Sequence, residues 1–377
     1  MTTPRLRVDS SAKYLRAIAN GDITAPQEVV ELLTKALGAK DYAECVKDLP
    51  SHNIDPQSYI DELDKAINIL TPESDIHERC VRALRKTCGV YGLLPDSHEV
   101  KFVLTAGEHA VASGGFSDIW KATDEDGEVF AVKVLRMYQN NAAQKYCREV
   151  IISKRMNHPN ILQIEGVAPG LFPCCMVSRW MENGNLLEYL NRNQAFVDRL
   201  DLLRGVIRGL NYLHKHQVVH GDLKSYNILI NEFGAPCLAD FGLSSIAEDI
   251  YSMSGSNAAS GGSVRWSAPE LVGSITARQE RWVHPTTQSD IYSLAMVIVE
   301  VFTGKIPFPD AINVQVIILM SKGDRPSKPP GVEALGLVPA LWKLTEECWH
   351  QSPERRPDIA NVLRRFQAIV EPGLFID

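Results

Sequence analysis

The sequence predicts an α+β protein in which an all-helical leader precedes two lobes. In residues 1 to 95, apolar side chains recur at the spacing of short amphipathic helices. Near residue 100 the chain changes to alternating, strand-like segments, which one helix follows, and after residue 184 it is mostly helical. Strands followed by a run of helices indicate an α+β arrangement, because repeated β–α units would alternate.

The leader is expected to contain helices whose apolar positions are Tyr59, Ile60, Leu63, Ile67 and Leu70 in one, and Ile76, Cys80, Val81, Leu84 and Cys88 in the next. Asp55-Pro56 and Thr71-Pro72 are typical of helix starts, in which a capping side chain precedes proline at the first helical position. Residues 88–95 (CGVYGLLP) contain two glycines and a proline, so we expect the connector there.

Composition restricts the class of protein. The net charge of −7 argues against a general nucleic-acid or membrane-surface binder, because polyanions select basic faces. The eight cysteines match no zinc-ligand spacing, and we expect them to be buried apolar residues. The first residues have no signal-peptide core, and no apolar run is long enough to span a membrane. We therefore expect an intracellular protein of the cytoplasm.

Strands are expected over residues 100–104, 118–123 and 129–134, and a helix over 142–156. Residues 112–119 (ASGGFSDI) partly match a GxGxxGxV hairpin, whose glycines let backbone amides approach phosphate groups closely. Ala112 and Ser117 replace the first and third glycines, and Gly114 keeps the second. Taken alone, the segment is equally consistent with an ordinary surface hairpin.

Lys133 ends the apolar segment Phe130-Ala-Val-Lys133, where a lysine is costly to bury without a partner. In kinases such a lysine holds the α- and β-phosphates of ATP and pairs with a glutamate on the next helix. Glu149 lies in the expected helix, and His158-Pro-Asn-Ile161 follows it. Alone, Lys133 could be a solubilising residue at a strand edge, but this order of residues favours a functional pair.

The segment His220-Gly-Asp-Leu-Lys-Ser-Tyr-Asn227 is the strongest local signal. Asp222 is expected to accept or orient the hydroxyl proton of a substrate, and Asn227 to hold magnesium. Lys224 can neutralise charge on a transferred phosphoryl group. Asp240, which opens Asp240-Phe-Gly242, offers a second oxygen ligand of the kind that magnesium prefers.

The ordered motifs continue with Ala268-Pro-Glu270, Asp290-Ile-Tyr-Ser-Leu and Arg355-Arg-Pro357. Residues 105 to about 368 therefore resemble a eukaryotic protein kinase domain, similar to the tyrosine-kinase-like group. The leader and connector resemble those of kinases that are numerous in mushroom-forming fungi. The resemblance implies a helical extension over 1–95 and a bilobal kinase domain over 100–372. Its β-rich N-lobe, with one regulatory helix, would span about 100–181, and its larger helical C-lobe about 182–372.

The resemblance also assigns roles by position, with ATP and Mg²⁺ as cofactors. The catalytic residues would be Asp222, Lys224, Lys133 and Glu149, and the magnesium ligands Asn227 and Asp240. ATP would be bound by Ala112, Ser113, Gly114, Gly115, Phe116, Ser117, Ile119, Ala131, Lys133, Arg179, Met181 and Leu229. Structural roles would fall to the ion pair of Glu270 with Arg356, to the stacked pair His220 and Phe241, and to Asp290 beneath the catalytic loop.

Two positions depart from the family pattern. Gly221 replaces the arginine that normally pairs with a phosphorylated activation segment, so we expect activity to depend little on that phosphorylation. Ser153 replaces a bulky apolar residue four positions after Glu149. We expect a partner or the leader to complete the packing around this helix.

The residues favour an active protein kinase in intracellular signalling that modifies Ser/Thr hydroxyls, because Lys224 is usual in that class; dual specificity stays open. The alternative is a pseudokinase scaffold that binds ATP, which Gly221, Ser117 and Ser153 would favour. A small-molecule phosphotransferase shares the His-Gly-Asp loop but lacks the Ala-Pro-Glu segment and its arginine partner. The expected partners are a protein substrate, ATP, and a regulatory partner or intramolecular contact of the leader. Neither nucleic acid nor a membrane is expected.

Overall fold

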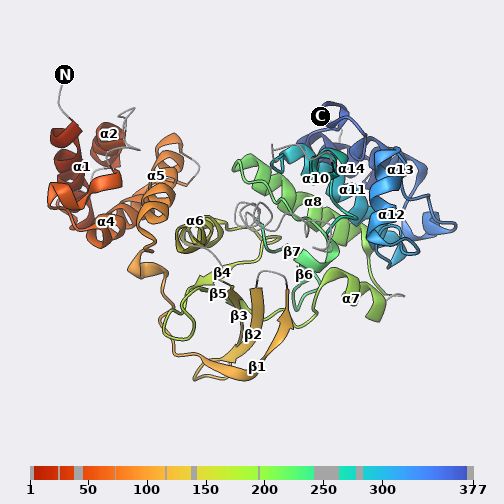
Figure 1. Cartoon of the computed structure of the whole chain (residues 1–377), viewed down its shortest axis with the longest axis horizontal. Coiled ribbons are helices and arrows are strands. Elements are labelled where there is room, and N and C mark those ends of the chain that lie inside the picture. The colour runs from red at the N-terminus through yellow and green to blue at the C-terminus, as the bar shows by residue number, and fades with distance from the viewer. Residues whose placement is uncertain are drawn as a thin grey trace. The chain divides into compact units, whose positions relative to one another are not determined.

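The computed structural model describes residues 4–23, 26–37, 46–72, 74–114, 117–136, 142–193, 196–241, 263–276 and 283–371. The chain forms two compact units (Figure 1). The first contains residues 1–155 and 164–179, and the second contains residues 156–163 and 180–377.

The first unit begins with the helices of the leader, α1 (Pro4–Ala19), α2 (Pro26–Leu37), α4 (Pro56–Ile69) and α5 (Asp75–Tyr91). Short 3-10 turns lie at Val46–Asp48, Pro50–His52 and Asp96–His98. The predicted apolar faces of the two later helices are confirmed as core, because their buried residues include Tyr59, Ile60, Leu63 and Ile67 of α4 and Ile76, Cys80, Leu84 and Cys88 of α5.

One of the two predicted helix starts is confirmed. Asp55 caps α4 by accepting a hydrogen bond from the Ser58 amide at 2.8 Å. The start predicted at Thr71-Pro72 is wrong, because the hydroxyl of Ser74 caps α5 instead. A side-chain cap satisfies an amide of the first turn, whereas a proline only tolerates that position, so the cap decides where the helix begins.

The connector begins later than predicted, and it extends over residues 92–104, from the end of α5 to the start of β1. Helix α5 continues through Cys88 to Tyr91 and ends at Gly92, whose φ of 67° is the left-handed conformation that glycine adopts easily. Gly89 lies inside the helix, and a side chain there would overlap the side chain of Arg148. Close packing against a neighbouring helix, rather than a break in the chain, therefore explains this glycine.

The sheet of the first unit has the strand order β1-β2-β3-β5-β4, and all neighbouring strands are antiparallel. Its strands are β1 (Thr105–Ser113), β2 (Ser117–Thr123), β3 (Val129–Leu135), β4 (Ile164–Gly166) and β5 (Cys175–Arg179). The strands predicted over 118–123 and 129–134 are confirmed. The strand predicted over 100–104 is wrong, because those residues lie in the connector and precede β1.

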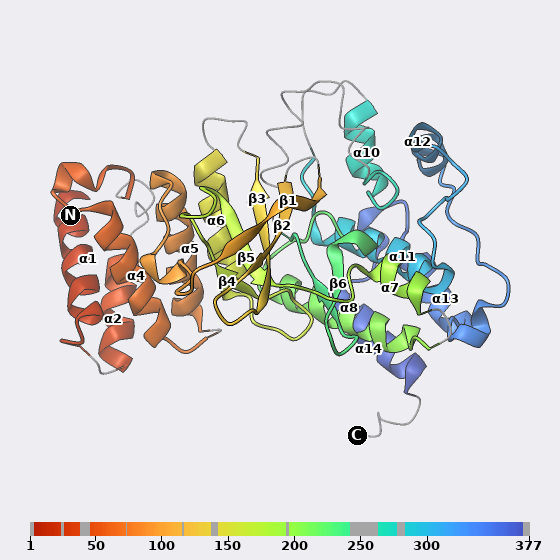
Figure 2. The same cartoon turned by 90° about the horizontal axis from the view of Figure 1, so that it is seen from below.

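Helix α6 (Ala142–Arg155) confirms the helix predicted over 142–156. It lies between α5 and the strands β4 and β5 (Figure 2). The sheet contributes its own buried cluster, which consists of Ala122, Phe130, Val132, Ala168, Cys175 and Val177. The first unit is therefore layered, with leader helices, then α6, then the sheet.

The connector is bonded to the end of β4. The Val167 amide donates to the His98 carbonyl at 2.9 Å, and the Val100 amide donates to the Val167 carbonyl at 3.0 Å. Gly166 permits this approach, because a Cβ there would lie 2.3 Å from the His98 carbonyl oxygen. The leader is thus attached to the sheet by backbone hydrogen bonds as well as by helix packing.

Gly166→Ala is expected to lower the free energy of unfolding by about 1–3 kcal/mol, because a methyl group must displace the connector backbone. Chemical denaturation of the whole chain measures the effect. Gly170→Ala is the matched control, since a Cβ at Gly170 would meet nothing within 4 Å. Equal stabilities for the two variants would show that the connector does not need this close approach.

The second unit is helical apart from a short ribbon of β6 (Ile228–Ile230) and β7 (Pro236–Leu238). Its helices are α7 (Leu186–Arg192), α8 (Arg199–Lys215), α10 (Pro269–Thr276), α11 (Thr287–Thr303), α12 (Asn313–Ser321), α13 (Pro339–Cys348) and α14 (Ile359–Val370). Further 3-10 turns span Ser225–Asn227, Val332–Leu335 and Pro353–Arg355. Helix α11 is the centre of this unit, because every residue from Ser289 to Phe302 is buried. The predicted α+β arrangement is confirmed.

The described cysteines are mostly buried, as predicted; they are Cys80, Cys88, Cys147, Cys175, Cys237 and Cys348, with Cys174 at an intermediate position. None of the helices in the described residues has both the length and the apolar character that crossing a membrane requires.

Candidate active site

Lys133 lies on β3 in the middle of the sheet, between β2 and β5. It is opposite Ile119 on β2 and opposite Met176 on β5. Ala131, two residues earlier on β3, shares its face because side chains alternate along a strand. The structure therefore brings the predicted residues Ile119, Ala131 and Lys133 together on one face of the sheet.

The β1–β2 hairpin carries the predicted phosphate-binding residues Ala112, Ser113, Gly114 and Ser117; Gly115 and Phe116 lie outside the described residues. The described part of the hairpin is held by Asp118, which accepts hydrogen bonds from Ser113 Oγ at 2.6 Å and from Arg136 Nε at 2.9 Å. The hydrogen bonds from Arg136 and Ser113 lower the pKa of Asp118 to about 2. The sequence analysis did not find this pair.

Glu149 is buried in α6, with 1% of its side chain exposed. The guanidinium of Arg85 on α5 approaches it, with Nη2 3.8 Å from Oε1. A buried carboxylate requires a cation or strong donors close by, so a position near positive charge is expected. The leader thus supplies one cation to the carboxylate that the sequence singled out.

Arg179 and Met181 occupy the predicted adenine-binding segment, and each belongs to a different compact unit. The guanidinium of Arg179 bonds to Glu128 at 2.5 Å and lies 4.9 Å from the centre of the Phe130 ring. Its side chain is therefore engaged within the first unit. In the second unit, Met181 and Leu229 pack on the buried cluster of Leu162, Cys237 and Ala239.

The catalytic-loop residues are in direct contact with one another. Lys224 Nζ donates to Asp222 Oδ2 at 2.6 Å and to Ser263 Oγ at 2.7 Å. Asn227 Nδ2 donates to the Asp222 carbonyl at 2.8 Å and to Asp222 Oδ2 at 2.9 Å. One amide and one ammonium group thus orient the Asp222 carboxylate.

Asp290 holds the start of this loop, as the resemblance implied. Its carboxylate accepts the amides of His220 at 2.8 Å and Gly221 at 2.9 Å, and it contacts His214 Nε2 at 2.8 Å. Burial lowers the pKa of His220, whose ring meets that of Phe241 edge-on at 6.4 Å between centroids. Gly221 has a φ of 80°, so glycine relieves strain that an arginine would carry there.

Asn227 and Asp240 lie at the same end of the β6–β7 ribbon. Ile228 is opposite Leu238, and the Ala239 amide donates to the Asn227 carbonyl at 2.9 Å. Asp240 follows directly, with a φ of 60° that side-chain-bearing residues adopt only at a cost of about 1–3 kcal/mol. The register therefore explains why two residues separated in sequence are neighbours, and the strained backbone is typical of functional positions.

Glu300 is a site residue that the sequence analysis missed. It is fully buried on α11 and accepts hydrogen bonds from Ser225 Oγ at 2.6 Å, the Ser225 amide at 3.2 Å and Trp266 Nε1 at 2.7 Å. It therefore joins the catalytic loop to the segment before Ala268-Pro-Glu270. A single carboxylate inside the apolar run IYSLAMVIVEVF was the available signal, because a buried charge needs partners.

Burial raises the pKa of Glu300 to about 7, against the hydrogen bonds from Ser225 and Trp266 and the charge of Lys224, which lower it. The folded chain thus binds this proton more tightly than the unfolded chain, whose glutamate pKa is 4.5. Stability from this group is complete below pH 4.5 and is lost as the pH rises to about 7. Between pH 4.5 and 8, the free energy of unfolding of the wild type should fall by about 3 kcal/mol because of this group, and Glu300→Gln should remove that fall. Chemical denaturation at several pH values measures it. Parallel pH profiles for both proteins would contradict this.

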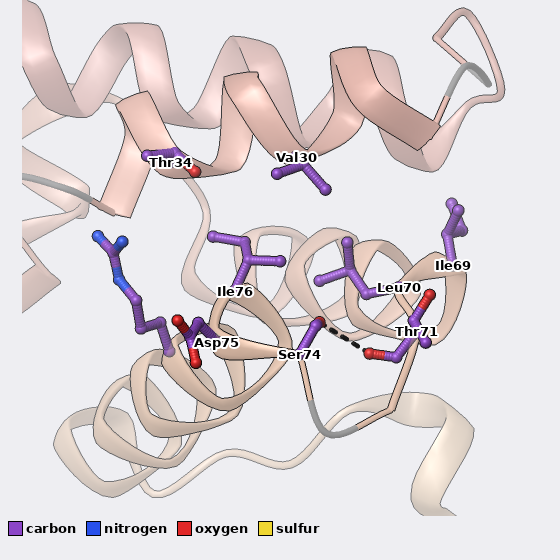
Figure 3. Close-up of a pocket in the computed structure, with 9 residues that line it drawn as sticks. Val30, Thr34, Ile69, Leu70, Thr71, Ser74, Asp75 and Ile76 are labelled. Atoms are coloured by element: carbon purple, nitrogen blue, oxygen red, sulfur yellow. Dashed lines mark hydrogen bonds between the residues drawn. The ribbon is translucent and has the colours of Figure 1, made fainter.

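A hollow of about 390 Å³ lies elsewhere in the first unit, between α2 and the turn from α4 to α5 (Figure 3). Val30 and Thr34 line it on one side, and Leu70, Ser74 and Ile76 on the other. Ser74 Oγ donates to the Thr71 carbonyl at 2.8 Å. None of the predicted site residues lines this hollow.

The protein tyrosine and serine/threonine kinase family matches residues 105–366, which is most of the chain. The chain belongs to this family. The kinase domain is 29% identical over 269 residues to serine/threonine-protein kinase STY17 of Arabidopsis thaliana, covering 70% of this chain and 44% of that protein. It is 31% identical over 277 residues to serine/threonine/tyrosine-protein kinase HT1 of Arabidopsis thaliana, covering 70% and 66%.

A third relative of the kinase domain is tyrosine-protein kinase SRK3 of Spongilla lacustris, 29% identical over 279 residues, with 71% and 78% of the two chains covered. The chain therefore spans less than half the length of STY17 but more than three quarters of SRK3. The names of the relatives include both Ser/Thr and Tyr specificities. The antiparallel sheet with α6 and the helical second unit are the two lobes of the kinase fold.

Proposed function

We propose that this kinase domain is catalytically active and transfers the γ-phosphate of ATP to Ser/Thr hydroxyls of proteins in intracellular signalling. The contact set of Asp222 with Asn227 and Lys224 carries the proposal. A scaffold needs no oriented carboxylate, whereas a phosphotransferase needs one beside a cation and a metal-ligand amide. The protein would consist of a helical extension over residues 1–95 and a kinase domain over 100–372.

Asp222 would accept or orient the proton of the attacking hydroxyl, because its carboxylate is fixed by two donors and remains 40% exposed. Lys224, which contacts the same carboxylate, would neutralise charge on the transferred group. Lys133 would hold the α- and β-phosphates, with Glu149 as its partner. Backbone amides of the β1–β2 hairpin would cover the phosphates; these residues are Ala112, Ser113, Gly114, Gly115, Phe116 and Ser117. Adenine would be bound by Ile119, Ala131, Leu229 and the segment of Arg179 and Met181.

Magnesium fits the residues that would hold it. Asn227 uses Nδ2 for both of its bonds to Asp222, which leaves Oδ1 as a ligand oxygen, and Asp240 adds a carboxylate at the same ribbon end. Mg²⁺ is commonly held by one or two protein oxygens together with phosphates and water. It would supply charge neutralisation of the phosphate oxygens. No cluster of three or more His, Cys, Asp and Glu residues suited to a metal occurs in the described part of the chain.

Ser/Thr specificity rests on Lys224, two positions after Asp222, and on STY17, which is named as a Ser/Thr kinase. Dual specificity is the second possibility that we retain, because HT1 is named for Ser, Thr and Tyr and SRK3 for Tyr. The pseudokinase alternative rests on Gly221, Ser117 and Ser153, which depart from the family pattern. We also propose a cytoplasmic location and, from the leader and connector, kinship with the kinases of mushroom-forming fungi.

Turnover of ATP with Mg²⁺ on generic Ser/Thr and Tyr protein substrates tests the proposal. We expect phosphate incorporation on Ser/Thr that disappears in Lys133→Met. Lys215→Met is the matched control, since this exposed lysine is the last residue of α8 and is not among the predicted site residues. Binding of ATP without incorporation by the wild-type chain would favour the pseudokinase.

A further inference from the structure

Helices α5 and α6 run side by side in opposite directions (Figure 2). A side chain at Gly92 would meet Ala143 near the start of α6, and one at Gly89 would overlap Arg148. One turn back along α5, Arg85 approaches Glu149. The contact between the two helices therefore extends from the start of α6 to Glu149, the residue proposed to pair with Lys133.

The interface between these helices is tightly closed. Cys88 of α5 and Cys147 of α6 have 0% and 2% of their surface exposed. Burial raises the pKa of both thiols, that of Cys147 to about 12, so both are neutral apolar contacts at pH 7. Gly89 leaves room for the side chain of Arg148 on α6. An interface of this kind transmits displacement, because packed interiors are not compressible.

The far end of α6 is anchored by a buried carboxylate of the leader. Asp64 on α4 is 2% exposed and pairs with Arg155, the last residue of α6. Ser97 Oγ donates to Asp64 Oδ2 at 2.6 Å, and His98 Nε2 lies 3.4 Å from Oδ1. Burial alone raises the pKa of Asp64, but the bonds from His98 and Ser97 and the charge of Arg155 lower it to about 2. Asp64 therefore joins α4, the connector and the end of α6.

We propose that the leader is the positioning scaffold of Glu149. Asp64 fixes the end of α6, and Arg85 holds the Glu149 carboxylate from the side of the leader, so that this glutamate stays in place for Lys133. The inference rests on the proposed function. Ser153, buried one turn after Glu149, occupies a position where a bulky residue was expected, so the helix relies more on contacts from the leader. Asp64 and Arg85 are thus positioning residues and do not touch the reacting groups.

The test uses the full chain with Asp64→Asn and Arg85→Met, and with Arg85→Lys as the conservative variant. Glu62→Gln is the control on α4, because Glu62 pairs with Arg16, 3.0 Å away, and Arg82→Met is the control on α5, because Arg82 pairs with Glu78. Two quantities are measured well below the melting temperature. The first is steady-state turnover of ATP, as kcat and KM, and the second is hydrogen exchange of the α6 amides.

We expect Asp64→Asn and Arg85→Met to lower kcat about tenfold and to speed exchange in α6. Arg85→Lys should recover most of the turnover, because a cation is kept, and both controls should match the wild type. If Arg85 had a purely structural role, its variants would lower the melting temperature, and Arg85→Met and Arg85→Lys would have the same kcat. Unchanged kcat and α6 exchange in Asp64→Asn and Arg85→Met would overturn the inference.

The exchange data separate this inference from the proposed function. If the wild-type chain shows no turnover, the proposed function is wrong, and exchange in α6 alone decides whether the leader fixes this helix. If Lys133→Met abolishes turnover but leaves α6 exchange unchanged, chemistry and positioning are distinct, as we infer.

Discussion

Asp222→Asn is expected to reduce phosphate transfer by about 10²–10⁴-fold while leaving the fold intact. The carboxylate is held by Lys224 at 2.6 Å and Asn227 at 2.9 Å. An asparagine keeps the shape and one acceptor oxygen, so both neighbours retain a partner. The amide cannot take the proton of a hydroxyl group. Because it is neutral, it also no longer orients the substrate hydroxyl by its charge. The loss should therefore appear in kcat.

Steady-state kinetics with ATP and a protein substrate measure this effect, and thermal melting confirms that the variant is folded. Asp201→Asn is the matched control, because Asp201 is a 64% exposed carboxylate that also pairs with a cation, Arg204, at 2.6 Å. We expect it to leave turnover and stability nearly unchanged. Turnover by Asp222→Asn close to that of the wild type would remove Asp222 from the chemistry.

Arg356→Met is expected to lower the free energy of unfolding of the second unit by about 3–5 kcal/mol. The Arg356 side chain is fully buried and bonds to both carboxylate oxygens of Glu270, at 2.7 and 2.8 Å. It also donates to the carbonyls of His350 and Gln288, both at 2.9 Å. Removing the guanidinium leaves the Glu270 carboxylate, whose side chain is only 24% exposed, and the two carbonyls with fewer hydrogen-bond partners. That penalty exceeds the loss of a surface ion pair.

Denaturation followed by tryptophan fluorescence reports this change, because Trp342 and Trp349 pack together in the second unit at 5.3 Å between ring centroids. Arg365→Met is the control, since Arg365 makes a similar two-bond pair with Glu347 at a partly exposed site. It should cost less than about 1 kcal/mol. The double variant Glu270→Gln/Arg356→Met should lose less than the sum of its single changes. Full additivity would show that the pair is not coupled.

Sequence reasoning succeeded where an interaction is local or follows a strong period. Asp222 and Asn227 lie five residues apart in one loop, so the motif alone marked both as site residues, although their contact with each other was not predicted. Lys133 was marked by its place at the end of an apolar strand, whereas Ile119 was assigned only by the resemblance. Glu270 and Arg356 are 86 residues apart, and only the resemblance pointed to their pairing; the structure shows it directly.

The residues that were missed are those whose partners lie far away in sequence and belong to no familiar motif. Asp64 and Arg155 are 91 residues apart, and nothing in either segment indicates the other. Glu300 and Ser225 are likewise 75 residues apart. The errors at Thr71-Pro72 and residues 88–95 have a different origin, because proline and glycine show only which conformations a chain can adopt. The start of α5 is set by the cap from Ser74, and Gly89 lies inside α5 because it packs against α6.

The backbone bonds between the connector and Val167 have a consequence for solubility. Strand β4 is the last in the order of the sheet, and an uncovered last strand offers amides and carbonyls to any other extended chain. At Val167, the residue after β4, the backbone groups of His98 and Val100 already form these hydrogen bonds. A fragment trimmed to the matched region, residues 105–366, would expose it. We expect such a fragment to self-associate through this edge, even where the remaining sheet and helices keep their fold.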